Sequence, residues 1–210
     1  MKSVEWKIEN KIIDYQYALS AMKERVGQIA SGQKKEFIWF LEHPPIYTAG
    51  SSAKSCDLIN QNNLPVFNVG RGGQYTYHGP GQRIVYIMLD LKKRDMADLK
   101  MYISKLQKSI MCTLKAFGLD AFTKKEHIGV WVKDLKGQTK KIAAIGIRIT
   151  KWITYHGLAI NIDPDLLNYK GIVPCGIKEF GITSLKALGL NIKMEEFDQI
   201  LALNLKKILL

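Results

Sequence analysis

The sequence has few cysteines. Among its 210 residues there are three, Cys56, Cys112 and Cys175, which are well separated and form no Cys-X-X-Cys pair. An odd number of separated cysteines argues against both a disulfide framework and a cysteine zinc site. Free thiols suit a reducing compartment, so a cytoplasmic location is expected.

Long apolar segments are also missing. No apolar run approaches the ~20 residues that a membrane-spanning helix needs, and residues 1–6 lack the apolar segment of a secretory signal. The hydrophobic share of 47% and the charged share of 24% are typical of globular proteins. The sequence therefore predicts one domain over residues 1–210 with a sizeable core and no membrane partner.

Acidic residues are scarce relative to basic ones. There are 19 Asp and Glu against 31 Lys and Arg, which gives a formal net charge of +12. Such a charge favours an acidic or polyanionic partner. The lysines are dispersed, however, and neither a run of five basic residues nor a nucleic-acid-binding motif occurs. An acidic protein partner is therefore plausible, and most of the excess charge is interpreted as solvated surface.

Several catalytic signatures are absent as well. The chain has no His-Glu-X-X-His motif, no P-loop, no dinucleotide-binding glycine pattern and no papain-like sequence around a cysteine. Its four histidines are far apart in the sequence, so no metal site is expected; they are His43, His78, His127 and His156.

Periodicity predicts an α/β (α+β) domain with a mostly antiparallel or mixed sheet flanked by helices. Apolar residues recur at helical spacing over residues 14–29, 99–117 and 195–210, with Asp14 as a candidate N-cap and Gly118 as a terminating glycine. Strands are expected at residues 36–41, 84–89, 128–132, 142–149 and 152–162, with a hairpin-like connection at 133–140. Two prolines predict irregular structure in residues 42–48, and residues 51–63 are expected to form a loop.

Residues 71–82, Arg-Gly-Gly-Gln-Tyr-Thr-Tyr-His-Gly-Pro-Gly-Gln, form the most informative segment. Four glycines and a proline accompany polar side chains, directly before a predicted strand. Glycine permits close approach of backbone to a ligand, and binding residues are often carried on loops beside a rigid sheet. The segment therefore predicts a binding loop.

Three further polar sites contain glycine. They are residues 141–146, which begin with Lys141, residues 156–161, which begin with His156, and residues 171–176, which contain Cys175 between Pro174 and Gly176. A reactive cysteine needs a nearby cation to lower the pKa of its thiol, and Lys141, His78 and His156 are the candidates. From the residues alone, an inert Cys175 remains the alternative.

Together these segments resemble the octanoyltransferases of lipoate biosynthesis, the lipoyl(octanoyl) transferase family. The motifs EHPPIYTAG, RGGQYTYHGPGQ, KIAAIGIRI, YHGLAIN and GIVPCG occur in the family's order over residues 42–176. Ala49 and Arg83 depart from the resemblance, because larger apolar residues are expected at both positions.

The resemblance implies the fold of biotin and lipoate protein ligases and a two-step acyl transfer. Cys175 would accept an octanoyl group from the phosphopantetheine of acyl carrier protein, and Lys141 would lower the pKa of the thiol. The acceptor would be a lysine of the lipoyl domains of 2-oxoacid dehydrogenase and glycine cleavage complexes, with no further cofactor. The acyl-binding residues implied are Arg71, Gly72, Gly73, Gln74, Tyr75, Thr76, Tyr77, His78, Ala144, Ile145, Gly146, Gly157, Leu158 and Ala159.

Backbone amides at Gly72, Gly73 or Gly176 are candidates to stabilise the tetrahedral oxyanion. Two rival functions remain at this point. An ATP-dependent lipoate or biotin ligase on the same fold would need no cysteine nucleophile. A non-catalytic nucleic-acid-binding module would be indifferent to thiol alkylation.

Overall fold

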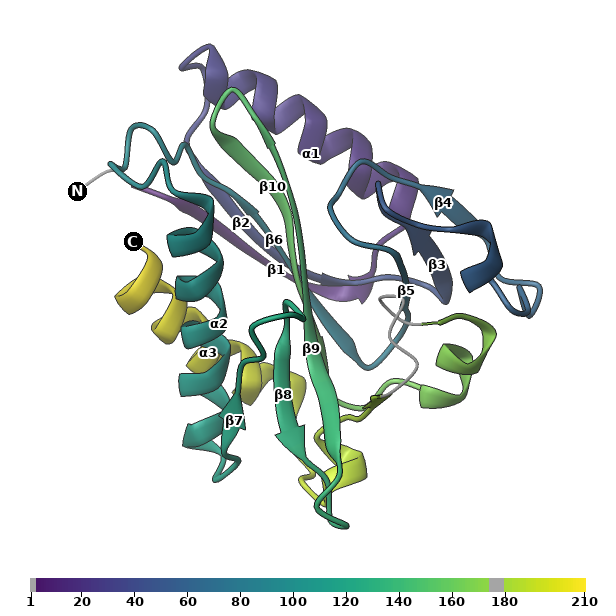
Figure 1. Ribbon diagram of the computed structural model, residues 1–210. Helices are drawn as coiled ribbons and strands as arrows, with labels where there is room; N and C mark the ends of the chain where they lie inside the picture. The colour runs from purple at the N-terminus through teal and green to yellow at the C-terminus, as the bar shows by residue number, and fades with distance from the viewer. Residues whose placement is uncertain (1–2, 174–179) are drawn as a thin grey trace.

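A computed structural model describes residues 3–173 and 180–210 (Figure 1). Within these residues the main sheet has eight strands in the order β1-β2-β6-β10-β9-β8-β7, with β11 paired to β9. The pairs β1–β2 and β9–β11 are parallel and the others are antiparallel, so the predicted mixed sheet is confirmed. The strands are β1 Glu5–Ile12, β2 Phe37–Glu42, β6 Gln82–Met88, β7 Ala121–Phe122, β8 Val130–Lys133, β9 Thr139–Thr150, β10 Ile153–Asn161 and β11 Gly181–Ile182.

Helices cover both faces of this sheet (Figure 1). On one face lies α1, Tyr15–Ala30, and its buried residues are the six apolar ones that the periodicity predicts. The Asp14 side chain accepts a hydrogen bond from the Tyr17 amide at 2.8 Å, which confirms the N-cap. The other face carries α2, Leu99–Ala116, and α3, Met194–Leu209, which pack on each other and on the sheet in the largest apolar cluster.

The buried faces of α2 and α3 differ in part from the prediction. Leu99 at the first turn of α2 is exposed, whereas Tyr102 is fully buried. Gly118 adopts φ +77° directly after the helix, as expected for a terminating glycine. Cys112 is half-buried on α2.

Arg83 is explained by a partner on α3. Its Nε and Nη2 atoms donate to the two carboxylate oxygens of Asp198 at 2.9 and 2.8 Å, and both side chains are buried. The large apolar residue expected at position 83 is therefore replaced by an ion pair that fixes α3 to β6. Ala49, the other departure, is buried in β3 among tyrosines.

A second, smaller sheet lies next to the first turn of α1, and it has three strands within the described residues. Its order is β4-β3-β5, and the strands are β3 Ile46–Ala49, β4 Val66–Asn68 and β5 Tyr75–His78. The irregular structure predicted for residues 42–48 is wrong from Ile46 onward, because β3 begins directly after the two prolines. The predicted binding loop likewise contains β5, and only residues 71–74 and 79–81 around it are irregular.

The remaining predicted connections agree with the structure. Residues 51–63 contain only a short 3-10 helix, Ser55–Asp57, and a turn at residues 134–138 joins β8 to β9. In the part of the chain after β10 that the structure describes, there are 3-10 helices at Leu166–Gly171 and Lys186–Leu188. None of the helices in residues 3–173 and 180–210 is long and apolar enough to cross a bilayer.

Candidate active site

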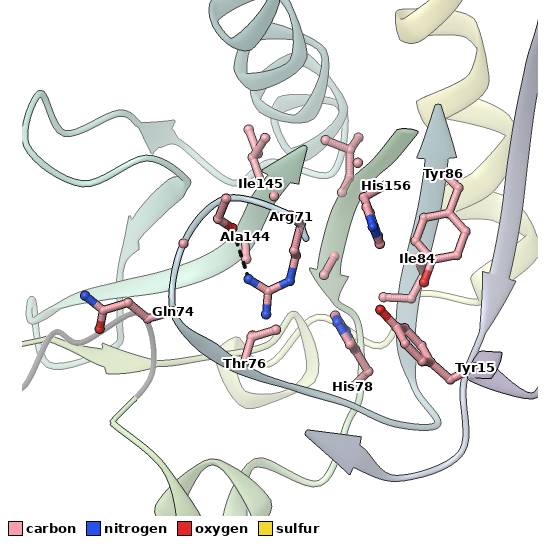
Figure 2. A pocket seen from close by; sticks show the side chains of 16 residues that line it. Tyr15, Arg71, Gln74, Thr76, His78, Ile84, Tyr86, Ala144, Ile145 and His156 are labelled. Carbon is pink, nitrogen blue, oxygen red and sulfur yellow. Dashed lines mark hydrogen bonds between the residues drawn. The ribbon is translucent and has the colours of Figure 1, made fainter. Parts of the chain in front are cut away.

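A pocket opens where residues 71–78 pass over β9 and β10. Its walls come from the glycine-containing segments of all three elements, and they enclose about 540 Å³ of space when the open solvent at the mouth is included (Figure 2). Every predicted acyl-binding residue except Tyr75 and Tyr77 lines it. Those two tyrosines pack instead in a separate cluster with Tyr47 and Tyr169, beneath the small sheet.

The pocket is also lined by four residues that are not among the predicted acyl-binding residues. They are Tyr15, Ile84, Tyr86 and His156. The sequence marks Tyr15 as a buried helix residue and Ile84 and Tyr86 as strand residues. Nothing in their local pattern distinguishes a pocket wall from the core, because only the packing of α1 and β6 against β10 brings them together.

Arg71 spans the middle of the pocket (Figure 2). Its Nη2 atom donates to the carbonyl oxygen and to the hydroxyl of Thr48, at 2.8 and 2.7 Å. The side chain crosses Gly146, where an added Cβ would lie 2.9 Å from the Arg71 Cδ atom. Gly146 therefore allows the guanidinium stem to lie flat on β9.

Arg71 begins a chain of buried hydrogen bonds. The Thr48 hydroxyl accepts from Arg71 and contacts Nε2 of His78 at 3.4 Å. His78 Nδ1 donates to the side-chain oxygen of Gln82 at 2.7 Å, because that oxygen can only accept. This bond assigns the tautomer of His78 and leaves Nε2 as the acceptor for Thr48.

Gln82 continues the chain toward the other end of the site. Its Nε2 atom lies 2.9 Å from Asn161 Oδ1 and 2.9 Å from the Tyr169 hydroxyl, and Asn161 in turn donates to the Thr183 carbonyl at 3.0 Å. Fully satisfied buried networks of this kind hold side chains in one arrangement. The network thus connects Arg71 in the pocket to Asn161 and Tyr169 beside Lys141.

Lys141 lies in a small adjoining cavity, which we call the lysine cavity. This cavity shares Thr76 and Ala144 with the pocket and is also lined by Lys141, Ala143, Asn161, Tyr169 and Ile182. Lys141 is 4% exposed, its Nζ atom donates to the Ile128 carbonyl at 3.2 Å, and the same atom lies 4.8 Å from the Trp131 ring centre. A buried ammonium with an aromatic face beside it is a strong local source of positive charge.

The histidines near the pocket are neutral. Burial lowers the pKa of His78 to about 3, and burial together with the positive charge of Arg71 lowers that of His156 to about 3. Burial also lowers the pKa of His43 to about 4, and this ring accepts from the Tyr86 hydroxyl while donating to the Ile13 carbonyl. His78 and His156 carry no charge near neutral pH, so neither can lower the pKa of the Cys175 thiol as a cation. Of the three candidates that the sequence offers, Lys141 remains.

Cys175, Pro174 and Gly176 lie outside the described residues. Of the other thiols, Cys56 is exposed and Cys112 is half-buried on α2. Within residues 3–173 and 180–210, no three His, Cys, Asp or Glu side chains are grouped as metal ligands would be.

Solved structures share this architecture. A bipartite lipoate protein ligase from Thermoplasma acidophilum superposes with a TM-score of 0.72 at 14% identity, covering 100% of this chain and 84% of the other. A lipoate-protein ligase A bound with ATP gives a TM-score of 0.70 at 16% identity, covering 98% and 85%. The fold is therefore that of the lipoate protein ligases, as the resemblance implies.

Sequence comparison identifies the family. The family described as the lipoyl protein ligase A/B catalytic domain matches residues 14–206. An octanoyltransferase of Ehrlichia chaffeensis is 54% identical over 198 residues, which covers 94% of this chain and 92% of the relative. One from Wolbachia pipientis wMel is 48% identical over 204 residues, covering 97% and 98%. The chain belongs to this family of acyltransferases, which excludes a non-catalytic nucleic-acid-binding module.

Proposed function

We propose that this enzyme transfers an octanoyl group from acyl carrier protein to a lysine of lipoyl domains, through a thioester on Cys175. The relatives are named octanoyltransferases, and structural neighbours are lipoate protein ligases, one of them described with its lipoyl domain. The observation that carries the proposal is the buried Lys141 in a cavity that adjoins the glycine-lined pocket.

The chain on either side of Cys175 supports this assignment. On the C-terminal side, Ile182 of β11 pairs with Lys141 and also lines the lysine cavity. The Phe180 ring packs on Trp131, with 5.3 Å between ring centres, and Trp131 is the residue whose face Lys141 contacts. On the N-terminal side, the Val173 amide donates to the Asp57 carbonyl at 2.7 Å. Residues only a few positions after Cys175 are thus tied directly to Lys141.

In the first step, the Cys175 thiolate attacks the carbonyl carbon of the octanoyl thioester. The new bond joins the cysteine sulfur to that carbon, the carbon–sulfur bond to phosphopantetheine breaks, and the carrier leaves as a thiolate. This thiolate takes the proton of the Lys141 ammonium, which leaves Lys141 neutral for the second step. One thioester replaces another, so the step is close to balanced and needs no ATP. A protonated Lys141 favours the thiolate form of Cys175.

In the second step, the lysine amine of the lipoyl domain attacks the acyl-cysteine. A carbon–nitrogen bond forms, the carbon–sulfur bond to Cys175 breaks, and the amine loses a proton. A neutral Lys141 accepts that proton and returns to the ammonium form, which restores the starting state. Conversion of a thioester to an amide drives the cycle forward. The backbone amides of Gly72, Gly73 or Gly176 are the proposed oxyanion donors.

Charge fits the two protein substrates. The proposal takes both the acyl carrier protein and the lipoyl domain to be acidic, and the enzyme has a formal net charge of +12. Electrostatic attraction between them would accelerate their encounter. No nucleic acid, membrane, metal or further cofactor takes part in this proposal, which keeps the cytoplasmic location expected from the free thiols.

Intact-protein mass spectrometry tests the mechanism. After incubation with octanoyl-acyl carrier protein and no ATP, the wild-type chain should gain one octanoyl group and Cys175→Ala none. Lys141→Ala should load roughly 100-fold more slowly, as expected when a proton-transfer group is removed. Cys56→Ala is the matched control, because it removes an exposed thiol, and it should load like the wild type.

Two results would contradict the proposal. An octanoyl group on Cys56 or Cys112 in place of Cys175 would overturn the assignment of the nucleophile. Lipoyl-domain modification that requires ATP and free octanoate, and that persists in Cys175→Ala, would identify the enzyme as a ligase.

A further inference from the structure

The pairing of β10 with β6 stops at His156, whereas its pairing with β9 continues through this residue. The φ of His156 is +59°, a left-handed conformation that is uncommon for a residue other than glycine inside a strand. Pairing with β6 runs from Asn161 to Gly157 and stops before His156. The Thr154 hydroxyl fills the gap, since it accepts from the Leu89 amide at 3.1 Å and donates to the Ile87 carbonyl at 2.8 Å. The fold thus holds His156 in a strained conformation, which is typical of functional positions.

The strain turns the imidazole toward the pocket wall beside Tyr86 (Figure 2). His156 is 4% exposed, and its Nε2 atom is buried without a hydrogen-bond partner. Buried polar atoms are nearly always paired, so an unpaired one in a pocket wall requires a reason. Two phenols, those of Tyr15 and Tyr86, line the same end of the pocket.

The strand register gives the length of the pocket. Ala144, which also lines the lysine cavity, lies opposite Ala159, and Ile147 lies opposite His156. Three residues along a strand span about 10 Å. An extended octanoyl chain measures about 9 Å from its carbonyl carbon to its methyl, given carbon–carbon bonds of about 1.5 Å in a zigzag. An eight-carbon chain that starts beside the lysine cavity therefore ends at His156.

We propose that His156 is the end wall of the acyl pocket and sets the length of the chain that the enzyme accepts. This inference rests on the proposed function. A chain longer than eight carbons has to press its last methylenes against the unpaired imidazole nitrogen of His156, in a wall that the buried rings of Tyr15 and Tyr86 complete. Covering polar groups with hydrocarbon is unfavourable, so the polar end rejects longer chains.

The test compares the acylation of the purified enzyme by octanoyl-, decanoyl- and dodecanoyl-acyl carrier protein. The wild type should show kcat/KM at least about tenfold lower with the twelve-carbon than with the eight-carbon chain, since each extra methylene in a fitted pocket matters. His156→Gly removes the wall and tolerates φ +59°, so the ratio of twelve- to eight-carbon kcat/KM should rise at least about tenfold. His156→Asn also tolerates this φ and keeps a polar group; it should give a smaller rise.

Leu106→Ala is the matched control, because Leu106 is fully buried on α2 on the opposite face of the sheet. It should lower the melting temperature and leave the chain-length ratio unchanged. Folded His156→Gly and His156→Asn proteins with the wild-type ratio, or with equal losses for all three chains, would overturn the inference. A wild type that takes up no octanoyl group would overturn the proposed function instead.

Discussion

Acidification from pH 7.5 to 5.5 should destabilise this enzyme through its buried histidines. The carboxyl of Asp198, whose pKa burial raises to about 6, takes up a proton in the folded state and offsets only part of this loss. His43, His78 and His156 are buried and neutral, with pKa values lowered by burial from 6.5 to about 4, 3 and 3. In the unfolded chain the pKa of each returns to about 6.5. The unfolded state therefore binds more protons, so stability is complete above pH 6.5 and declines as the pH falls toward the folded-state values.

The size of the effect follows from linkage. Unfolding takes up about 0.1 proton per histidine at pH 7.5 and about 0.9 at pH 5.5, an average of about one half. Over these two pH units each histidine therefore removes about 1.4 kcal/mol of stability, which gives about 4 kcal/mol for the three. A typical domain has a free energy of unfolding of about 5–15 kcal/mol, so this loss is a large share of the total.

Urea denaturation at a series of pH values measures this effect. His156→Asn should reduce the pH-dependent loss by about 1.4 kcal/mol, because one titrating ring has been removed. A variant that keeps the whole wild-type loss, or a wild type whose stability is the same at pH 7.5 and 5.5, would refute the argument that these rings are buried as neutral groups.

Three more predictions follow from particular contacts. Asp198→Ala should lower the free energy of unfolding, measured by urea denaturation, by about 3–5 kcal/mol, because it leaves the Arg83 guanidinium buried without its carboxylate. The double variant Arg83→Met, Asp198→Leu should be at least as stable as the wild type. The same loss of stability in the single and the double variant would refute this. Gly129→Ala should slow octanoyl loading and lower the melting temperature. The backbone φ of Gly129 is +143°, and a new Cβ would lie 2.8 Å from the Ala143 oxygen and 3.1 Å from Lys141 Cε. Unchanged loading would show that Gly129 does not help to position Lys141. Raising salt should lower kcat/KM with acyl carrier protein more than with a small octanoyl thioester, and an equal response of both would exclude electrostatic steering.

Periodicity predicted the elements that bury one apolar face. The helix α1 begins and ends within a residue of the expected range, since Asp14 caps it and its apolar stripe is continuous. Periodicity did not predict β1, a largely exposed edge strand in which charged residues are interspersed with Trp6, Ile8 and Ile12. This strand depends on its parallel pairing to β2. Periodicity also missed β3 and β5, which are four residues each and are defined by pairing with each other.

The site was predictable to the extent that it is local. Motif resemblance named most of the pocket residues, because Arg71 to His78 and the glycines of β9 and β10 are contiguous in the sequence. The neutral state of His78 could not be predicted, because burial lowers the pKa of this ring and that burial depends on segments distant in the sequence. The left-handed φ of His156 could not be predicted either. It occurs where the Thr154 hydroxyl, in place of a backbone amide, donates to the Ile87 carbonyl of β6.

The side-chain amide of Gln82 has a wider consequence. It contacts His78 of β5, Asn161 of β10 and Tyr169 of the 3-10 helix Leu166–Gly171. Flipping the Gln82 amide or rotating the His78 ring would therefore break several buried hydrogen bonds at once. If the pocket takes a fatty chain as proposed, the walls that these bonds hold would keep their shape on binding, and the ordering cost would fall mainly on the flexible hydrocarbon. A stop held in one place at the far end would then discriminate between chains by length.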